Sequence, residues 1–228
     1  MTSAGNDVVS LAAIDITRTN QHKFYSKILS DSEIPLYNEF SLAQIPFEVF
    51  VWLLWSIKES AYKFLQRDNP ELLFTPVKFV VTEVFIPKGL RLESLALPLS
   101  NGVGFRNTLA IKSTVQFAER TLHSCSLLYD ELIHTVVNHS IDFDGVYWGV
   151  KKIEGDDNAL QSAEVRSFLL ERLTKLYDDG DFNVDKNSYG CPVVLNRDIN
   201  ITMPVSFSHH GCFVGYSFPP LPCQKFIE

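Results

Sequence analysis

The chain has 228 residues, of which 46% are hydrophobic and 21% charged, and its net charge is −7, from 27 acidic and 20 basic residues. This composition is typical of a globular protein and excludes a largely disordered chain. At roughly 150 residues per domain, the length fits one large domain or two small ones. An acidic chain has no overall positive field for a nucleic-acid backbone, so nucleic-acid binding is disfavoured.

The apolar and cysteine patterns favour a cytoplasmic protein without a membrane span. The most apolar window, residues 47–57, has nine apolar residues in eleven, whereas a transmembrane helix needs about 20. Residues 1–6 are small and polar and do not resemble a signal peptide. The four cysteines have no C-x-x-C spacing, so we expect reduced thiols rather than a zinc site on paired cysteines.

The first half of the chain is expected to combine strands and helices. Its clearest element is a helix at residues 46–67, because Pro46 suits a first helical turn and Pro70 stops the helix. Thr19 is the expected N-cap of an earlier helix. The other expected elements are a strand at 7–16, helices at 19–30 and 32–40, strands at 78–86, 109–120 and 131–138, and a loop at 87–108.

The pattern starts again after a change in composition near residues 138–145. The expected elements are then a strand at 146–153, an amphipathic helix at 159–177, and short strands at 193–195, 205–207 and 212–218. Each half therefore reads as a strand, a helix and further strands, although no residue-level repeat is visible. The sequence predicts an α+β fold of two similar α/β lobes, residues 1–138 and 139–228.

Two segments of the first half carry side chains suited to chemistry. Asp7 begins an apolar strand soon after Gly5, which permits close approach of another element, although Asp7 could also be a turn residue. Lys58 and Glu59 interrupt a helix that is otherwise apolar nearly all round, where charge is costly unless it is paired or functional. Glu59 and Lys63 are four residues apart, a spacing that also fits an ordinary surface ion pair.

In the third segment, residues 206–211, Ser208 and His209 lie where an expected strand runs into a turn that contains glycine. A serine beside a histidine raises the possibility of a hydrolase. Adjacent residues on a strand point to opposite faces, however, so they make a poor nucleophile–base pair. The chain also lacks the G-x-S-x-G nucleophile elbow. A structural role for these polar residues is the alternative.

Together the three segments resemble the 4′-phosphopantetheinyl transferase superfamily. That family carries a G-x-D segment, a W-x-x-K-E-[AS]-x-x-K helix and an S-x-S-H turn, which correspond here to residues 5–7, 55–63 and 206–209. Residues 189–192, Y-G-C-P, are similar to a Y-G-K-P segment of the family. The order of the motifs is that of the short holo-acyl-carrier-protein synthases, but this chain is about twice as long.

The resemblance implies an enzyme that transfers phosphopantetheine from coenzyme A (CoA) to a serine of an acyl or peptidyl carrier protein and releases 3′,5′-ADP. Mg²⁺ would be held by Asp7 and Glu59, and two carboxylates suffice when phosphate and water oxygens complete the site. Glu59 would accept the serine proton, and Lys63 would act with it in catalysis. The implied cofactor-binding residues are Lys58, Lys63, Gly190, Pro192, Ser208 and His209.

Departures from the family pattern bear on affinity and architecture. Asn6 replaces a usually aliphatic residue, and Cys191 replaces the lysine of Y-G-K-P, which removes one phosphate partner. The expected architecture is a pseudo-dimer in which the metal lobe precedes the nucleotide lobe and CoA binds between them, so that a monomer holds one complete site. The alternative is one synthase-like domain with an insertion at about 85–185 that still forms trimers.

Carrier domains are usually acidic, so a basic surface should receive them. Arg18, His22, Lys23 and Lys27 gather on one expected helix beside the G-x-D strand and are the candidate docking residues, although a solvated helix face explains them as well. At a net charge of −7 such a patch acts only within a Debye length of about 8–10 Å. A non-catalytic CoA- or carrier-binding protein on the same fold is the alternative function.

Overall fold

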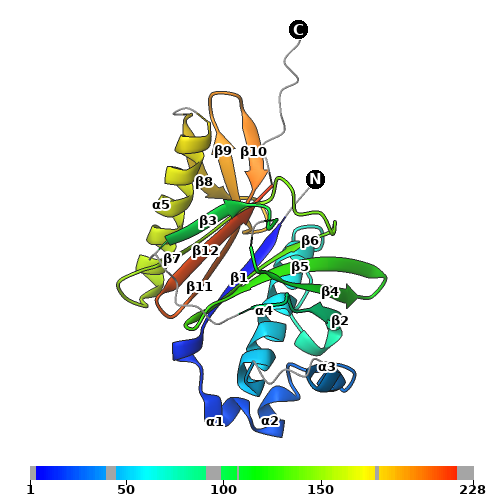
Figure 1. Ribbon diagram of the computed structural model, residues 1–228. Helices are drawn as coiled ribbons and strands as arrows, with labels where there is room; N and C mark the ends of the chain where they lie inside the picture. The colour runs from blue at the N-terminus through cyan, green and yellow to red at the C-terminus, as the bar shows by residue number, and fades with distance from the viewer. Residues whose placement is uncertain (1–3, 40–44, 91–98, 107, 178–179, 220–228) are drawn as a thin grey trace.

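The structure is a computed structural model that describes residues 4–39, 45–90, 99–106, 108–177 and 180–219. Within these residues the fold is α+β, with antiparallel sheets of five, four and three strands (Figure 1). The α+β class predicted from the sequence is therefore correct.

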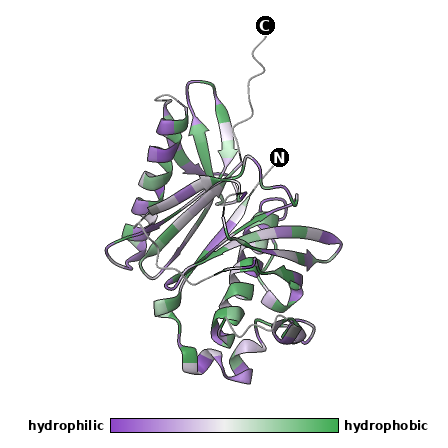
Figure 2. Cartoon of the chain, in the orientation of Figure 1, coloured by the Kyte–Doolittle hydropathy of each residue, from purple (hydrophilic) through white to green (hydrophobic). Residues whose placement is uncertain are grey.

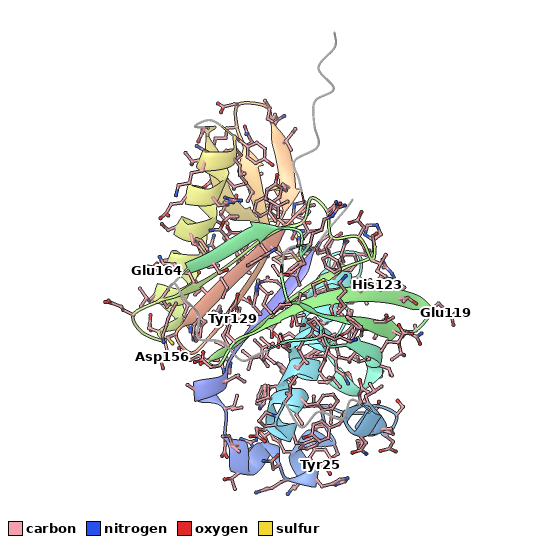
Figure 3. The ribbon with its side chains drawn as sticks, in the orientation of Figure 1. Tyr25, Glu119, His123, Tyr129, Asp156 and Glu164 are labelled. Carbon is pink, nitrogen blue, oxygen red and sulfur yellow. The ribbon has the colours of Figure 1, made fainter. Side chains whose placement is uncertain are left out.

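The five-stranded sheet has the order β1-β6-β5-β4-β2 and lies beside the long helix α4 (Figure 1). Its strands are β1 (Gly5–Ser10), β2 (Val80–Phe85), β4 (Ile111–Phe117), β5 (Arg120–Leu128) and β6 (Leu132–Asn138). The helices of this half are α1 (Ile16–Thr19), α2 (His22–Tyr25), α3 (Ile34–Glu39) and α4 (Phe47–Gln66). Figure 3 labels Tyr25 among the short helices, where its ring meets that of Phe47 with 5.1 Å between centroids.

Helix α4 forms the core of this half because it is apolar over most of its surface (Figure 2). Val51, Leu54, Ile57 and Ala61 follow one another at helical spacing and are fully buried. The helix begins directly after Pro46, as the sequence predicts. Among the described helices, none combines the length and the apolarity that crossing a membrane requires.

The other two sheets belong mainly to the second half of the chain. The four-stranded sheet has the order β11-β12-β7-β3, and the three-stranded sheet has the order β10-β9-β8. Their strands are β3 (Leu99–Val103), β7 (Tyr147–Lys152), β8 (Phe182–Lys186), β9 (Pro192–Asn196), β10 (Ile201–Pro204), β11 (Ser206–His210) and β12 (Phe213–Phe218). Helix α5 (Asn158–Leu176) packs Val165, Phe168, Leu169 and Leu173 into their core.

Several elements differ from the sequence predictions. Within the helix expected at residues 19–30 the structure has only the short helix α2, and α1 precedes it. The Asp15 side chain caps α1 by accepting from the backbone N–H of Arg18 at 2.8 Å. Thr19 ends α1 instead of capping a helix. Strand β3 lies within the expected loop, and β5, β8 and β10 were not predicted. Figure 3 shows Glu119 at the tip of the β4–β5 hairpin.

Strand β1 joins the two larger sheets, and all six of its residues are buried. One edge pairs with β6, and the other faces β11. Ser206 Oγ accepts from the backbone N–H of Asn6 at 3.0 Å, and His210 Nδ1 accepts from that of Ser10 at 3.1 Å. Side chains of β11 thus satisfy backbone donors that would otherwise be buried without partners.

Next to β1, strand β6 carries a buried histidine. The His134 ring is fully buried, neither of its nitrogens has a hydrogen-bond partner among the described residues, and it lies 5.8 Å from the Trp148 ring. Burial lowers the pKa of His134 to about 3. The ring therefore stays neutral in the folded protein under conditions where the unfolded chain takes up a proton.

We expect this histidine to make folding stability fall as pH decreases from about 6.5 towards 3, since only the unfolded state is protonated in that window. At pH 5 the loss from this group is about 2 kcal/mol. His134→Leu removes it, so the variant should lose about 2 kcal/mol less than the wild type between pH 7 and pH 5. Urea unfolding at both pH values measures the difference, and equal losses in the two proteins would contradict the prediction.

Candidate functional site

The site begins where β1 and α4 approach each other closely. A Cβ atom on Gly5 would lie only 2.0 Å from the carbonyl oxygen of Ser60, so no other residue fits here without a shift of the helix. The close approach predicted from the glycine is confirmed. It sets Asp7, two residues along β1, against the face of α4 that carries Glu59 and Lys63.

The ammonium of Lys63 lies between the two carboxylates that the sequence singled out. Its Nζ is 3.1 Å from Asp7 Oδ1 and 3.2 Å from Glu59 Oε1. Asp7 is buried, whereas Glu59 and Lys63 are partly exposed. One positive charge thus occupies the point where two negative charges converge.

The electrostatics of the three groups follow from their burial and proximity. Burial raises the pKa of Asp7 to about 7, although the positive charge of Lys63 opposes this shift. Burial by itself would lower the pKa of Lys63, but attraction to Asp7 and Glu59 raises it above its usual range. A lysine held between two acids in this way remains protonated and serves as their counter-ion.

The carboxylate pair suits a hard divalent cation. Among the described residues, Asp7 Oδ2 is buried and makes no hydrogen bond of normal geometry, although the Ser56 hydroxyl lies close enough to help lower the pKa of Asp7. The described residues contain no group of three or more His, Cys, Asp or Glu side chains arranged to hold a metal. Two carboxylates with phosphate and water oxygens are a set that Mg²⁺ accepts. Asp7 and Glu59 therefore fit the expected ion, with Lys63 at the cation position between them.

Strand β11 brings alternate side chains to β1 and to the opposite face. Ser208 Oγ accepts from Asn6 Nδ2 at 2.7 Å and is buried. His209, on the opposite face, is exposed, and its pKa is lowered by partial burial and by Lys63. The structure therefore brings His209 into the electrostatic range of Lys63. Ser208 lies in the contact with β1, where its hydroxyl holds Asn6.

The turn between β8 and β9 forms a second wall beside α4. A cavity of about 240 Å³ is lined by Lys63 from α4, by Arg67 directly after this helix, by Gly190 and Cys191 from this turn and by Pro192 at the start of β9. Gly190 adopts a positive φ of 79°, which glycine takes at no steric cost. Residues far apart in the sequence, including the predicted Gly190 and Pro192, thus meet Lys63 at one cleft.

Residues 3–87 match the sequence model of the 4′-phosphopantetheinyl transferase superfamily. The match confirms the superfamily resemblance and includes Asp7, Glu59 and Lys63. The match covers less than half of the chain, and it indicates phosphopantetheinyl transferase activity in general. No curated protein and no solved structure matches the chain.

Lys58 does not reach the cleft, although it occupies the family's lysine position directly before Glu59. Its side chain is fully buried, and its ammonium donates to Glu33 Oε2 and to the Ile28 carbonyl, both at 2.6 Å. Glu33 also accepts from the backbone N–H of Val81 at 2.7 Å. An ammonium without an exposed atom has no access to a phosphate, so the expected cofactor-binding role of Lys58 is replaced by a structural one.

Sequence reasoning missed Glu33, Asn6 and Arg67 as parts of this region. No local sequence pattern identifies Glu33, because its ion pair with Lys58 joins residues that are 25 positions apart in the chain. Asn6 was noted only as a departure from the superfamily pattern, yet it holds Ser208. Arg67 could have been found, since it follows Lys63 by four residues and so lies on the same face of the helix.

We expect Lys58→Met to lower the free energy of unfolding by about 3–5 kcal/mol, because it leaves the buried Glu33 carboxylate without its counter-ion. Lys151→Met is the matched control. Lys151 pairs with Glu164 at 2.6 Å near the surface, where Figure 3 labels Glu164 on α5, and such a pair contributes about 0–1 kcal/mol. Chemical denaturation of both variants measures the two losses, and losses of equal size would contradict a structural ion pair at Lys58.

Proposed function

We propose that this protein transfers the 4′-phosphopantetheine group of CoA to a serine of an acyl or peptidyl carrier protein, with Mg²⁺, and releases 3′,5′-ADP. The observation that carries the proposal is the convergence of Asp7 and Glu59 on one ammonium at the edge of a cleft between α4 and the β8–β9 turn. The superfamily match over residues 3–87 supports the same reaction class. The proposed enzyme resembles a holo-acyl-carrier-protein synthase.

Asp7 and Glu59 would hold the metal, and Lys63, displaced from between them, would contact the diphosphate. When bound, Mg²⁺ neutralises the charge that builds up on the diphosphate oxygens. A change of the Lys63 side-chain rotamer would bring its ammonium to the diphosphate, because Lys63 is partly exposed and lines the cleft. His209 contributes a further polar group near Lys63.

The reaction is a single phosphoryl substitution. The carrier serine oxygen forms a bond to the phosphorus that bears pantetheine, the bond from that phosphorus to the leaving 3′,5′-ADP breaks, and the serine proton passes to Glu59. Glu59 suits this role because it is partly exposed, whereas Asp7 is buried. Cys125, Cys191 and Cys212 are free thiols, which agrees with the proposed cytoplasmic location.

We also propose that the chain is a monomeric pseudo-dimer of residues 1–138 and 139–228. Two repeats of the same topology support it. In the first half, β1 precedes the long helix α4 and pairs with the last strand, β6, and β6 pairs with β5. In the second half, β7 precedes α5 and pairs with the last strand, β12, and β12 pairs with β11. Strand β3 crosses from the first half to pair with β7. Gel filtration separates this proposal from the trimer.

The proposed carrier partner would dock on the basic surface of α1 and α2. Arg18, His22, Lys23 and Lys27 are all exposed there. Arg18 lies over the Phe24 ring at 5.0 Å, which fixes one edge of the surface. These helices follow β1 along the chain, so a carrier bound to them lies on the lobe that carries Asp7.

We expect Asp7→Asn and Glu59→Gln each to reduce transfer to a carrier by at least about 100-fold, because each removes a carboxylate from the metal pair and the second also removes the proton acceptor. Mass spectrometry of a panel of apo carriers after incubation with CoA and Mg²⁺ measures the transfer. Chelation of Mg²⁺ should reduce it in the wild type.

Glu48→Gln is the matched control, since Glu48 lies on the same helix near its N-terminus and its side chain contacts Asn20. It should retain wild-type activity. Full activity of Asp7→Asn or Glu59→Gln would contradict the proposal that these two carboxylates hold Mg²⁺. CoA binding without any gain in carrier mass would favour the non-catalytic alternative.

Reversing charge in the docking surface should weaken only the carrier interaction. We expect Lys23→Glu combined with Lys27→Glu to raise the KM for the carrier about tenfold and to leave CoA affinity unchanged, because these charges steer an acidic partner. The effect should shrink in high salt. Lys175→Glu, exposed on the last turn of α5, is the control. Equal effects of the two sets of changes would contradict docking on α1 and α2.

A further inference from the structure

Arg67 presents an unusual cation in the cleft. It follows the last residue of α4, is half-buried, and lines the 240 Å³ cavity with Cys191 and Ser206. Of its five N–H donors, one on Nη2 donates to the carbonyl of Val205, while Nε is buried without a partner. The guanidinium therefore retains donors that nothing in the described part of the chain uses.

The positive charge of Arg67 also lacks a counter-ion. No carboxylate among the described side chains pairs with it, and the adjacent Asp68 pairs with Arg120 instead, at 3.0 Å. Burial lowers the pKa of Arg67, and among the described groups Cys191 opposes this shift. Burying a cation without a partner is costly, so the arrangement favours an anion that arrives from outside the chain.

The cavity suits one charged group of a larger ligand. Its volume of about 240 Å³ is below the roughly 300–1,000 Å³ typical of sites that enclose a whole small molecule. Lys63, one helical turn away on the same face, is already shared by Asp7 and Glu59, where the diphosphate is expected. No described carboxylate pairs with Arg67, so its guanidinium is available to an anion without a bridging metal.

We propose that Arg67 binds the 3′-phosphate of CoA and supplies the positive charge that the Y-G-C-P segment lacks at Cys191. This proposal rests on the proposed function. A phosphate monoester carries about −1.5 to −2 charges at neutral pH, and a guanidinium pairs with it through two parallel hydrogen bonds. Cys191 lies on the same cavity wall, which explains how the motif can lose its lysine while the cleft keeps a cation.

The test compares CoA with 3′-dephospho-CoA, which lacks only this phosphate, by titration calorimetry at fixed Mg²⁺. The wild type should bind CoA at least about tenfold more tightly, since charge-assisted bonds of this kind are strong. Arg67→Gln should remove the preference by weakening CoA alone, and unchanged binding of dephospho-CoA also shows that the variant is folded. Adding Cys191→Lys to Arg67→Gln should restore part of the preference.

Two further variants make the result decisive. Arg197→Gln is the control, because Arg197 is exposed and pairs with Asp181 away from the cavity. Arg67→Lys keeps the charge and a donor for Val205, so it replaces the glutamine variant if that one fails to fold. Its preference for CoA should fall about threefold, because an ammonium lacks the planar fork.

Three outcomes would overturn the proposal. In the first, the wild type binds the two ligands equally; in the second, Arg67→Gln weakens both ligands alike, which indicates a structural role through Val205. If the wild type still modifies a carrier in these cases, the proposed function stands and only the role of Arg67 fails. In the third, the wild type binds no CoA and modifies no carrier, and both proposals fail together.

Discussion

The burial of β1 between two sheets is the constraint on which the rest of the site depends. A strand buried along its whole length needs partners for both edges. Strand β6 satisfies one edge through its backbone, and β11 satisfies donors on the other through Ser206 and His210. Because Asp7 lies on this strand, the same contacts that hold the two halves of the chain together also fix the buried carboxylate of the site.

The close contact of β1 with α4 transmits this constraint to the helix. Gly5 lets the two backbones meet, so the Lys63 ammonium pairs with Asp7 on β1 as well as with Glu59 on its own helix. The neighbouring Lys58 lies about 100° around the helix from Glu59 and faces the interior, where Glu33 neutralises it. Lys58 therefore stabilises the fold, whereas the adjacent Glu59 pairs with Lys63, which lines the cleft.

The surroundings of Lys63 and of Arg67 differ in their balance of positive and negative charge. At Asp7 and Glu59, two acids share one lysine, and this excess of negative charge suits a divalent cation. At Arg67 a cation lacks an acid, and this excess of positive charge suits an anion. A ligand with an anionic group near a metal and a second anionic group further along complements this arrangement. That complementarity agrees with the transferase chemistry indicated by the superfamily match.

The sequence by itself determined the α+β class, the long helix and the pairing of Glu59 with Lys63, because these depend on local periodicity and a spacing of four residues. Its motifs also pointed to the superfamily whose sequence model matches residues 3–87. Only the tertiary structure decided the partners of Lys58 and Ser208, since Glu33 and Asn6 lie far from them in the chain. It also decided that β3 joins the sheet of the second half and that Arg67 faces Cys191. Local pattern fixes which side chains share a face, but the packing of distant strands fixes which charges are neutralised and which remain for a ligand.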